Sequence, residues 1–409
     1  MDRFIRDRSA RLRMRVGPLA PYMDEFAQRL TAKGFKRKSG RYHFRLVAAF
    51  SSWLKAKRIK AQSVRHDHVQ LYLRERKQLP RPGDATCLNG FLDMLRDKGI
   101  VMKFVPALET TPAESVAEQF AQYLRQERGL AGSTICAYSA FVKAFLEDVF
   151  DREPIDWSSL SVQDVIKFVQ RKAKIIPPKH AQYLTTALRS FLKYARYRDY
   201  IQADFAAAVP AVASWSMAGI PKALPLVHIE RVLSSCDRTT IGGRRDYAIF
   251  LLLARLGLRA GEIVSLKLAD LDWINGSVSI RGKGGKCARL PMPIDVGEAI
   301  VDYLQNGRPP ANSRILFLRE TAPIAGFKDQ QAIGSVVRRA LKRAGIDAPR
   351  QGSHQFRHAL ATNMLHRGAS LSEIGEILRH QLPCTTAIYA KVDLAALREL
   401  ALPWTGGVQ

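Results

Sequence analysis

The chain has 409 residues, which corresponds to about two to four domains and excludes a single small module. It carries 64 lysines and arginines against 37 aspartates and glutamates, so a folded surface with a net charge of +27 must attract a polyanion. Hydrophobic residues make up 47% of the chain and charged residues 25%, which is a globular balance and excludes a disordered basic tail.

The cysteines and the lengths of the apolar stretches indicate where in the cell the protein is found. Five cysteines without a CxxC pair argue against a disulfide framework or zinc ribbon and favour a reducing compartment. No apolar stretch approaches the roughly 20 residues that cross a bilayer. The arginine-rich first 20 residues lack the apolar core of a secretory signal, and Asp2 and Asp7 count against a transit peptide. We therefore expect a cytoplasmic protein with no membrane association.

Helical spacing of apolar residues dominates the first half of the chain. An i, i+3, i+4, i+7 stripe is formed by Leu46, Val47, Phe50, Trp53 and Leu54. A second helical stretch begins at Phe120 and carries further stripes as far as Leu192. Prolines between residues 80 and 112 interrupt the pattern and place a domain boundary near residue 110.

The two helical stretches are similar to each other. FAQ-x-L occurs over residues 26–30 and again over 120–124, an offset of 94, and Phe50 matches Phe145 at an offset of 95. This indicates a diverged internal duplication, with chance agreement between two amphipathic bundles as the alternative. We expect residues 1–110 to form a helical extension, a second copy or an unrelated bundle, and residues 111–207 to form a helical domain.

Residues 208–225 are rich in proline and small residues, which is typical of an interdomain linker. Beyond them a helix is predicted over residues 244–256. Two β-prone runs, 277–280 and 288–291, then flank a turn of glycines and lysines and predict a β-hairpin, and ILFL at Ile315 predicts another strand. The domain over residues 226–409 should be mixed, and the chain as a whole mainly α with a small β-sheet (α+β).

Four separated segments of this last domain hold chemically useful polar residues. They are Arg259 in GLRAGE, Lys283 in RGKGGK, His354 and Arg357 in SHQFRH, and His380 and Tyr389 in LRHQLPCTTAIY. Taken alone, each is most simply a surface charge, a satisfied histidine or a packed aromatic. These separate interpretations do not explain why the residues occur together in the order Arg, Lys, His-x-x-Arg, His, Tyr.

That order resembles the catalytic domain of the tyrosine recombinases, the phage integrase family. GLRAGEIVSL, RGKGGKCARLP, HQFRHALATNML and TTAIYAKVD each look like a motif of the family, in the family's order. Residues 116–200 resemble its helical, SAM-like core-binding domain, whereas residues 1–110 have no counterpart beyond the internal repeat. One departure is Arg379, where the family usually has glycine before the histidine.

Cleavage of a DNA phosphodiester needs a nucleophile, cations for the non-bridging oxygens and a proton donor for the leaving oxygen. The candidate catalytic residues are Arg259, Lys283, His354, Arg357, His380 and Tyr389. The arginines suit two phosphate oxygens, the histidines can bond the phosphate or move a proton, and Lys283 can protonate the departing 5′ oxygen. Tyr389 is the phenol nucleophile, and the resemblance implies a 3′-phosphotyrosine intermediate formed without metal, cofactor or ATP.

Other residues near these motifs have open or ordinary roles. Glu262 either orients Arg259 or stabilises a helix start, and His358 is expected to pack. Lys286 and Arg289 are expected to contact backbone phosphate or solvent. Finally, an apolar tail helix is predicted by Leu394, Leu397 and Leu400. In the family such a tail docks on a neighbouring protomer, and docking on its own domain is the alternative.

The sequence therefore predicts a site-specific recombinase or integrase of a mobile element that acts on double-stranded DNA. We expect it near the nucleoid, assembling as a tetramer on paired sites, alone or with related recombinases. Two alternatives stay open. One is relaxation of DNA by a type IB topoisomerase-like monomer, and the other is a catalytically silent DNA-binding partner of a related recombinase.

Overall fold

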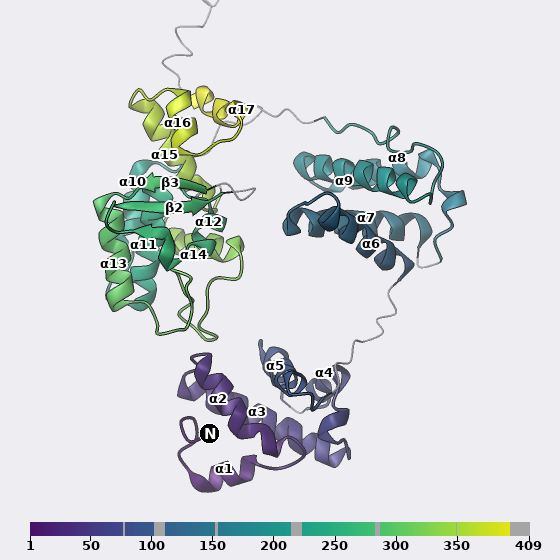
Figure 1. Ribbon diagram of the computed structural model, residues 1–409, viewed down its shortest axis with the longest axis vertical. Helices are drawn as coiled ribbons and strands as arrows, with labels where there is room; N and C mark the ends of the chain where they lie inside the picture. Colours follow the sequence, from purple (N-terminus) through teal and green to yellow (C-terminus); the bar gives the residue numbers. More distant parts are fainter. Residues whose placement is uncertain are drawn as a thin grey trace, which may run out of the picture. The chain divides into compact units, whose positions relative to one another are not determined.

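The fold is described from a computed structural model (Figure 1). It covers residues 1–76, 78–101, 111–151, 154–213, 223–282, 287–348 and 350–392. The chain falls into two compact units: Val105–Ala218, and Met1–Phe104 together with Gly219–Gln409. The predicted boundary at residue 110 and the middle of the predicted linker lie outside the described residues, so these finer limits stay a prediction.

The N-terminal part is helical, as its apolar spacing predicts. Its elements are α1 (Arg8–Met14), η1 (Ala20–Tyr22), α2 (Met23–Ala32), α3 (Arg37–Ala56), η2 (Ala61–Ser63), α4 (His66–Glu75) and α5 (Asp84–Asp97). Phe26 lies at the centre of the core, with its ring centroid 5.6 Å from that of Phe44 and 5.0 Å from that of Phe91. These three rings tie α2, α3 and α5 together.

The unit Val105–Ala218 is a second helical bundle. It contains α6 (Pro112–Gln126), α7 (Gly132–Phe150), η3 (Trp157–Ser159), α8 (Val162–Ile175) and α9 (Pro178–Tyr197). Thr111 and Ser161 each accept a hydrogen bond from the backbone N–H three residues on, which fixes where α6 and α8 begin. Phe120, Phe145 and Phe191 are fully buried where α6, α7 and α9 pack.

The remaining part, residues 223–392, combines helices with a small sheet. Its helices are α10 (Leu226–Ser234), α11 (Ile241–Arg255), α12 (Ala260–Ser265), η4 (Leu268–Asp270), α13 (Ile294–Asn306), α14 (Gln330–Arg343), α15 (His354–His366), α16 (Leu371–Ile377), α17 (Pro383–Thr386) and η5 (Ala387–Val392). The buried helix α11 packs against α13 and α15. Within the described ranges, none of the helices has the length and apolarity that crossing a bilayer requires.

The sheet is antiparallel in the order β1 (Leu271–Asp272), β2 (Ser277–Arg281), β3 (Cys287–Pro291). The predicted hairpin is confirmed, with Val278 paired to Leu290 and Arg281 to Cys287. The strand expected at ILFL is wrong. Ile315 and Leu318 each make an isolated bridge, to Lys267 and Gly326, while Leu316 and Phe317 between them are fully buried. The segment is apolar because its side chains are buried in the core, and it forms no continuous β-ladder with a neighbouring strand.

Helix α15 connects two hydrophobic clusters. Phe356 belongs to the main core and stacks on Phe250 of α11, with ring centroids 5.7 Å apart. One turn further on, Ala361 belongs to a smaller cluster that contains Leu378 and Tyr389. Helix α15 therefore contributes to both the main core and the smaller cluster that contains Tyr389.

Candidate active site

The turn between α11 and α12 positions the first motif residue. Gly257 has left-handed backbone geometry, with φ 57°. A Cβ at this position would lie 2.8 Å from Leu378 Cδ2, so a side chain there would have to displace its neighbours. The turn brings Arg259 to the N-cap of α12, as the glycine before it predicts.

Arg259 is held by the carboxylate of Glu262. The Arg259 backbone N–H donates to Glu262 Oε2 over 2.8 Å, and its guanidinium Nη1 donates to Oε1 over 2.8 Å. Glu262 is only 5% exposed, whereas about a third of the Arg259 side chain is open to solvent, at 34%. Both roles considered for Glu262 are therefore present, because it caps α12 and orients Arg259.

Arg379, at the position where the family usually has glycine, is a second partner of the same carboxylate. Its Nη2 donates to Glu262 Oε2 over 2.9 Å and its Nη1 to the Ile377 carbonyl over 3.2 Å. The backbone at Arg379 is left-handed, with φ 55°, which favours glycine. Burial and the cation of Arg259 lower the pKa of Arg379, and the opposing effect of Glu262 is smaller than that of burial.

Arg357 is the most deeply buried cation of the group, 4% exposed on α15. Its Nη1 donates to the Gly257 carbonyl over 2.5 Å, and its Nη2 donates to the Leu378 carbonyl. Burial, followed by the charges of Arg259 and Arg379, lowers its pKa to about 9. Carbonyls rather than a carboxylate hold Arg357, so its positive charge is not neutralised by a bonded partner.

His354 begins α15 and its side chain is exposed. Surrounding protein atoms, then the cations of Arg357 and Arg259, lower its pKa below the ordinary value for histidine. His354 and Arg357 are three residues apart on one helix, as their spacing predicts. The structure thus brings His354, Arg357 and Arg259 close enough to influence one another's charge.

Tyr389 is buried, 1% exposed, in η5. Its hydroxyl lies 2.9 Å from His358 Nδ1, and the two rings meet edge to face at 5.7 Å. Burial raises the pKa of Tyr389 to about 12, although the nearby Arg357 acts to lower it. His358 was expected to pack, and it is instead the hydrogen-bond partner of the predicted nucleophile. Its place one helical turn after His354 was the available signal.

His380 completes the group. Its Nδ1 lies 2.7 Å from Thr386 Oγ1, and its ring is parallel to that of Tyr389 with centroids 6.5 Å apart. Burial, then the cations of Arg357, Arg259 and Arg379, lower its pKa to about 4. His380 is therefore neutral near pH 7 and can accept a proton or donate a hydrogen bond.

A cavity of about 640 Å³ lies against these residues. Arg259, Arg379 and His380 line it together with Gly282 and Cys287, which lie at the ends of β2 and β3. Lys283 and Lys286, on the turn between these strands, lie outside the described residues. Arg289 pairs with Asp272 and donates to Ser277 Oγ over 2.6 Å, so it is held by the sheet itself.

The charges around this cavity suit an anion. Arg259 and Arg379, which line it, share the buried carboxylate of Glu262, and the cation of Arg357 acts on both of them and on His380. One carboxylate among three arginines leaves excess positive charge here. Planar guanidinium groups match the geometry of phosphate oxygens. Among the described residues, no group of three or more His, Cys, Asp or Glu side chains could hold a metal ion.

Two family models match the chain: the phage integrase family over residues 223–395, and the phage integrase N-terminal SAM-like domain over residues 117–199. The chain is also 48% identical, over 394 residues and 96% of either length, to a Sinorhizobium fredii protein named as an integrase/recombinase, y4rA. The chain belongs to the phage integrase family. The resemblance seen in the four motifs is thereby confirmed.

Further relatives belong to the same family. The chain is 31% identical to the tyrosine recombinase XerD of Listeria monocytogenes over 292 residues, which cover 69% of this chain and 96% of XerD. The structure of the Tn1549 transposon integrase in complex with a circular intermediate DNA matches with a TM-score of 0.51 at 19% identity, over 70% of this chain and 99% of that chain. The predicted fold class, mainly helical with a small sheet and a SAM-like domain before the catalytic domain, is confirmed.

The backbone at Arg379 yields a stability prediction. Arg379→Gly and Arg379→Ala remove the same ion pair, but only alanine keeps a Cβ at φ 55°. We expect the glycine variant of the integrase to be more stable by about 1 kcal/mol, because left-handed backbone penalises a Cβ. Urea unfolding of the two variants measures the difference. An alanine variant as stable as the glycine variant would contradict this account of the backbone.

His380 predicts how stability depends on pH. The unfolded chain takes up this proton near pH 6.5, whereas the folded integrase does so only near pH 4. Between these values the unfolded state binds more protons, so lowering the pH through this window should destabilise the fold. His380→Gln should reduce that loss in urea unfolding at pH 7 and pH 5. His366→Gln, at the exposed end of α15, is the control, and equal effects of the two changes would refute the assignment.

Proposed function

We propose that this integrase is the site-specific recombinase of a mobile element, which cuts and rejoins double-stranded DNA through a 3′-phosphotyrosine intermediate without metal or ATP. The observation that carries the proposal is the grouping of Arg259, Arg357 and His380 beside the hydroxyl-bearing ring of Tyr389. The names of the relatives, an integrase/recombinase and a transposon integrase, support a mobile element as its context.

In this mechanism the two arginines hold the scissile phosphate. Each terminal nitrogen of a guanidinium carries two N–H groups, so Arg357 can bond Gly257 and Leu378 and still donate to a phosphate oxygen. Arg259 is more exposed and is oriented by Glu262, which suits it to a second oxygen. Charge that develops on the non-bridging oxygens would then meet fixed donors that need no reorganisation.

The two histidines would work as neutral groups. The pKa values of His354 and His380 lie below the ordinary value, because of the protein atoms and the cations that surround each ring. Each can therefore donate a hydrogen bond to a phosphate oxygen, or accept the proton that the tyrosine must lose. A neutral acceptor is needed here, since burial raises the pKa of Tyr389 to about 12.

Tyr389 must leave its buried position to react. Its oxygen would attack phosphorus, form the 3′-phosphotyrosine bond and break the bond to the 5′ oxygen, which departs with a proton from Lys283. The ester retains the energy of the broken linkage, so the 5′-hydroxyl of a partner strand can reverse the step. With the hydroxyl bonded to His358 and 1% of the residue exposed, the arrangement of η5 is a resting one.

The wider assembly belongs to the same proposal. Residues 111–207 would grip duplex DNA opposite the catalytic domain, as the match to the SAM-like family model supports. Four copies would join on paired sites, alone or with related recombinases, by exchange of the tail helix. The leucines expected to form its apolar face, Leu394, Leu397 and Leu400, lie outside the described residues. We place this activity in the cytoplasm, at the nucleoid.

The nucleophile can be tested directly. Tyr389→Phe removes one oxygen and little volume, so folding and DNA affinity should survive while covalent protein–DNA adducts disappear. The measurement is denaturing electrophoresis after incubation with nicked duplexes taken from the DNA that adjoins the coding sequence. Tyr303→Phe removes an equally buried phenol oxygen in the same part of the chain and should still form adducts. Adducts that persist without the Tyr389 hydroxyl would point to another nucleophile.

A modified substrate can distinguish the proposed role of Lys283 as a general acid from simple binding of phosphate. A thiol, with a pKa of about 8.5, leaves without protonation, whereas an alkoxide does not. Lys283→Ala should cleave normal DNA poorly and recover most cleavage on DNA with sulfur at the scissile 5′ bridging position. Arg259→Ala should recover on neither substrate, because both need charge stabilisation. Equal defects of Lys283→Ala on the two substrates would reject this role and direct attention to Lys286.

A further inference from the structure

The positive charge of the chain is concentrated in its first quarter. Residues 1–101 contain 24 lysines and arginines against 9 aspartates and glutamates, whereas residues 111–201 contain 13 against 10. The first segment thus contributes more than half of the net charge of +27. Both family models begin after it, at residues 117 and 223. Neither the candidate active site nor the SAM-like domain accounts for this charge.

The two helical segments nevertheless share one architecture. The succession α2, α3, η2, α4, α5 is repeated as α6, α7, η3, α8, α9. The start of α3 precedes that of α7 by 95 residues, and the starts of η2 and α4 precede those of η3 and α8 by 96. A spacing of 95 to 96 residues over three consecutive elements favours a repeat over chance agreement between bundles.

The buried positions and the final turn repeat as well. Phe26 and Phe120 are both at most 4% exposed, and so are Val69 and Val165. FLDMLR at residues 91–96 corresponds to FLKYAR at residues 191–196. After each run, one left-handed residue ends the helix, Gly99 with φ 70° and Asp199 with φ 57°. The next backbone N–H then returns to the carbonyl five residues earlier, over 3.0 and 2.9 Å.

What differs between the segments is the surface of one helix. The N-terminal half of α3 carries four exposed cations, and the positions of α7 that lie 95 residues later are uncharged. The pairs are Arg37 and Gly132, Lys38 and Ser133, Arg41 and Cys136, and Arg45 and Ala140. The two segments share their helix order and differ in the charge of one helix face.

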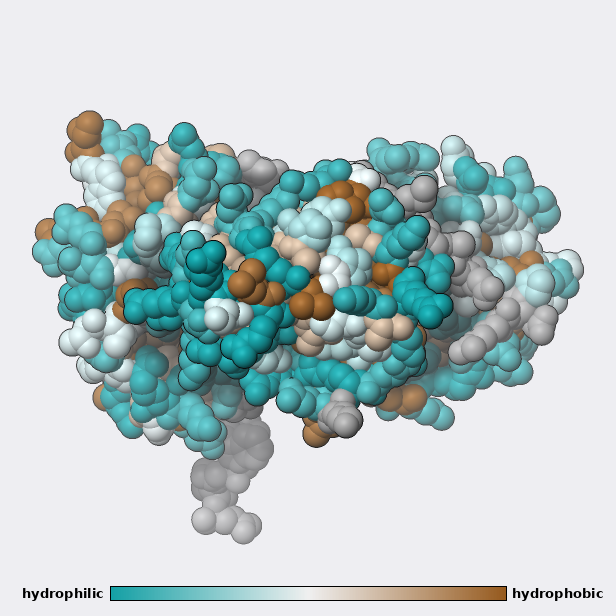
Figure 2. All heavy atoms as spheres, turned by 90° about the horizontal axis from the view of Figure 1, so that it is seen from below, coloured by the Kyte–Doolittle hydropathy of each residue, from teal (hydrophilic) through white to brown (hydrophobic). Residues whose placement is uncertain are grey.

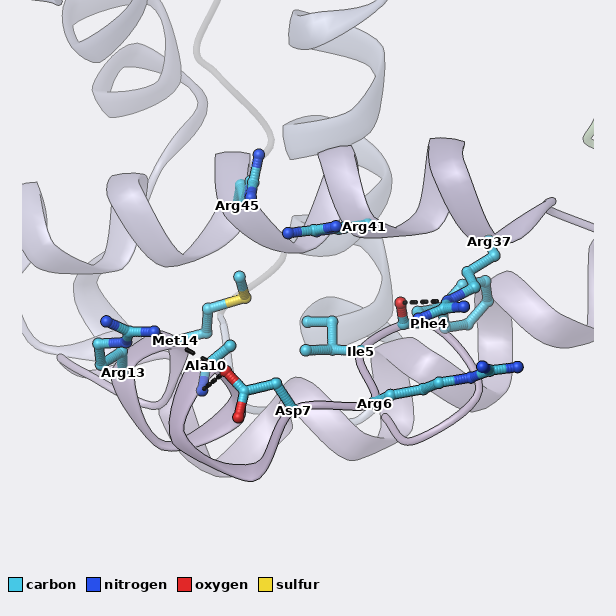
Figure 3. A pocket seen from close by; sticks show the side chains of 10 residues that line it. All are labelled: Phe4, Ile5, Arg6, Asp7, Ala10, Arg13, Met14, Arg37, Arg41 and Arg45. Atoms are coloured by element: carbon cyan, nitrogen blue, oxygen red, sulfur yellow. Dashed lines mark hydrogen bonds and ion pairs between the residues drawn. The ribbon is translucent and has the colours of Figure 1, made fainter.

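The three arginines of this helix face, Arg37, Arg41 and Arg45, border a hollow of about 420 Å³ between α3 and the start of the chain. Figure 3 shows Arg37, Arg41 and Arg45 spaced along one helix, with Arg6 and Arg13 on the opposite segment. The one acidic residue among the residues that line it, Asp7, accepts hydrogen bonds from the backbone N–H groups of Ser9 and Ala10. The hollow is therefore strongly positive.

Arg41 and Arg45 have no protein partner within the described residues. Both also line a second hollow, where Arg81 and Lys38 add further charge. Three arginines spaced four residues apart lie about 6 Å from one another along the helix, so each can reach a different phosphate. Figure 2, which shows the molecule from below, shows a mostly hydrophilic face with hydrophobic side chains scattered in small groups. Charge without a large apolar patch suits a solvated polyanion rather than a protein core.

We propose that residues 1–101 form a second DNA-binding domain of this recombinase, whose α3 face binds the phosphate backbone of duplex DNA through Arg37, Arg41 and Arg45. The choice of DNA as the polyanion rests on the proposed function. The domain would extend the grip of each protomer beyond the stretch held by the SAM-like and catalytic domains. Its contacts go to phosphates, so they add affinity and footprint length rather than base readout.

The test uses the full chain and a long duplex of random sequence. Arg41→Glu with Arg45→Glu should weaken binding about tenfold or more and reduce the slope of log K against log salt by about two. Lys60→Glu with Arg74→Glu makes the same change of charge on exposed residues of the same domain, away from both hollows, and should change binding less than about threefold. The milder pair Arg41→Gln with Arg45→Gln should give an intermediate loss, and circular dichroism establishes that each variant is folded.

The outcomes separate this inference from the proposed function. If the wild type forms covalent adducts and the Arg41 and Arg45 variant binds DNA like its control, the second domain is refuted and the recombinase proposal stands. If the wild type forms no adduct and the Arg41 and Arg45 variant still binds DNA more weakly than its control, the recombinase proposal is refuted and the second DNA-binding domain stands. A variant with unchanged DNA binding and salt slope that fails to pair with a second copy would show that the α3 face binds protein, and would overturn the proposal.

Discussion

One buried carboxylate organises the candidate active site. Glu262 accepts from the backbone and the guanidinium of Arg259 and from the guanidinium of Arg379, so it joins the start of α12 to the segment that carries His380. Without it, two arginines would repel each other beside a third, Arg357, at low dielectric. A single carboxylate among three cations lets them lie close together and still leaves positive charge for a phosphate.

The same crowding of charge sets the protonation of the neighbours. His354, His358 and His380 all have lowered pKa values, because surrounding protein atoms displace water from each ring and neighbouring charges act in the same direction. Tyr389 lies in the same environment, where burial keeps its phenol protonated and His358 bonds it. Electrostatics and burial therefore favour neutral histidines and keep Tyr389, the predicted nucleophile, away from solvent.

Much of this could be predicted because local signals were sufficient. The β-hairpin follows from β-prone runs around a glycine turn, and the amphipathic stripe at residues 46–54 lies in α3 as its spacing requires. The hydrogen bond of His358 does not follow from the sequence, because its partner Tyr389 is 31 residues away and helical periodicity does not show which face of α15 meets η5. The left-handed backbone of Arg379 could not be predicted from the sequence either, because the partner of its side chain, Glu262, is 117 residues away. The segment that begins at Ile315 is a false positive of the same local signals. Its apolar run is typical of a strand, but the residues are apolar because they are buried in the core.

The two similar helical segments, residues 1–101 and 111–201, differ in their surfaces far more than in their cores. Phe26 and Phe120 occupy matching core positions, and Arg41 and Cys136 occupy matching surface positions. The matched core positions hold the same residue type, whereas the matched surface positions differ in charge. An exposed helix face contributes little to the folding free energy, so it can accumulate or lose arginines at small cost to stability. The chain thus presents the same helical arrangement twice, once with a basic surface and once with a nearly neutral one. Substitutions that move cations between the matching positions of α3 and α7 would therefore change surface charge without changing the core.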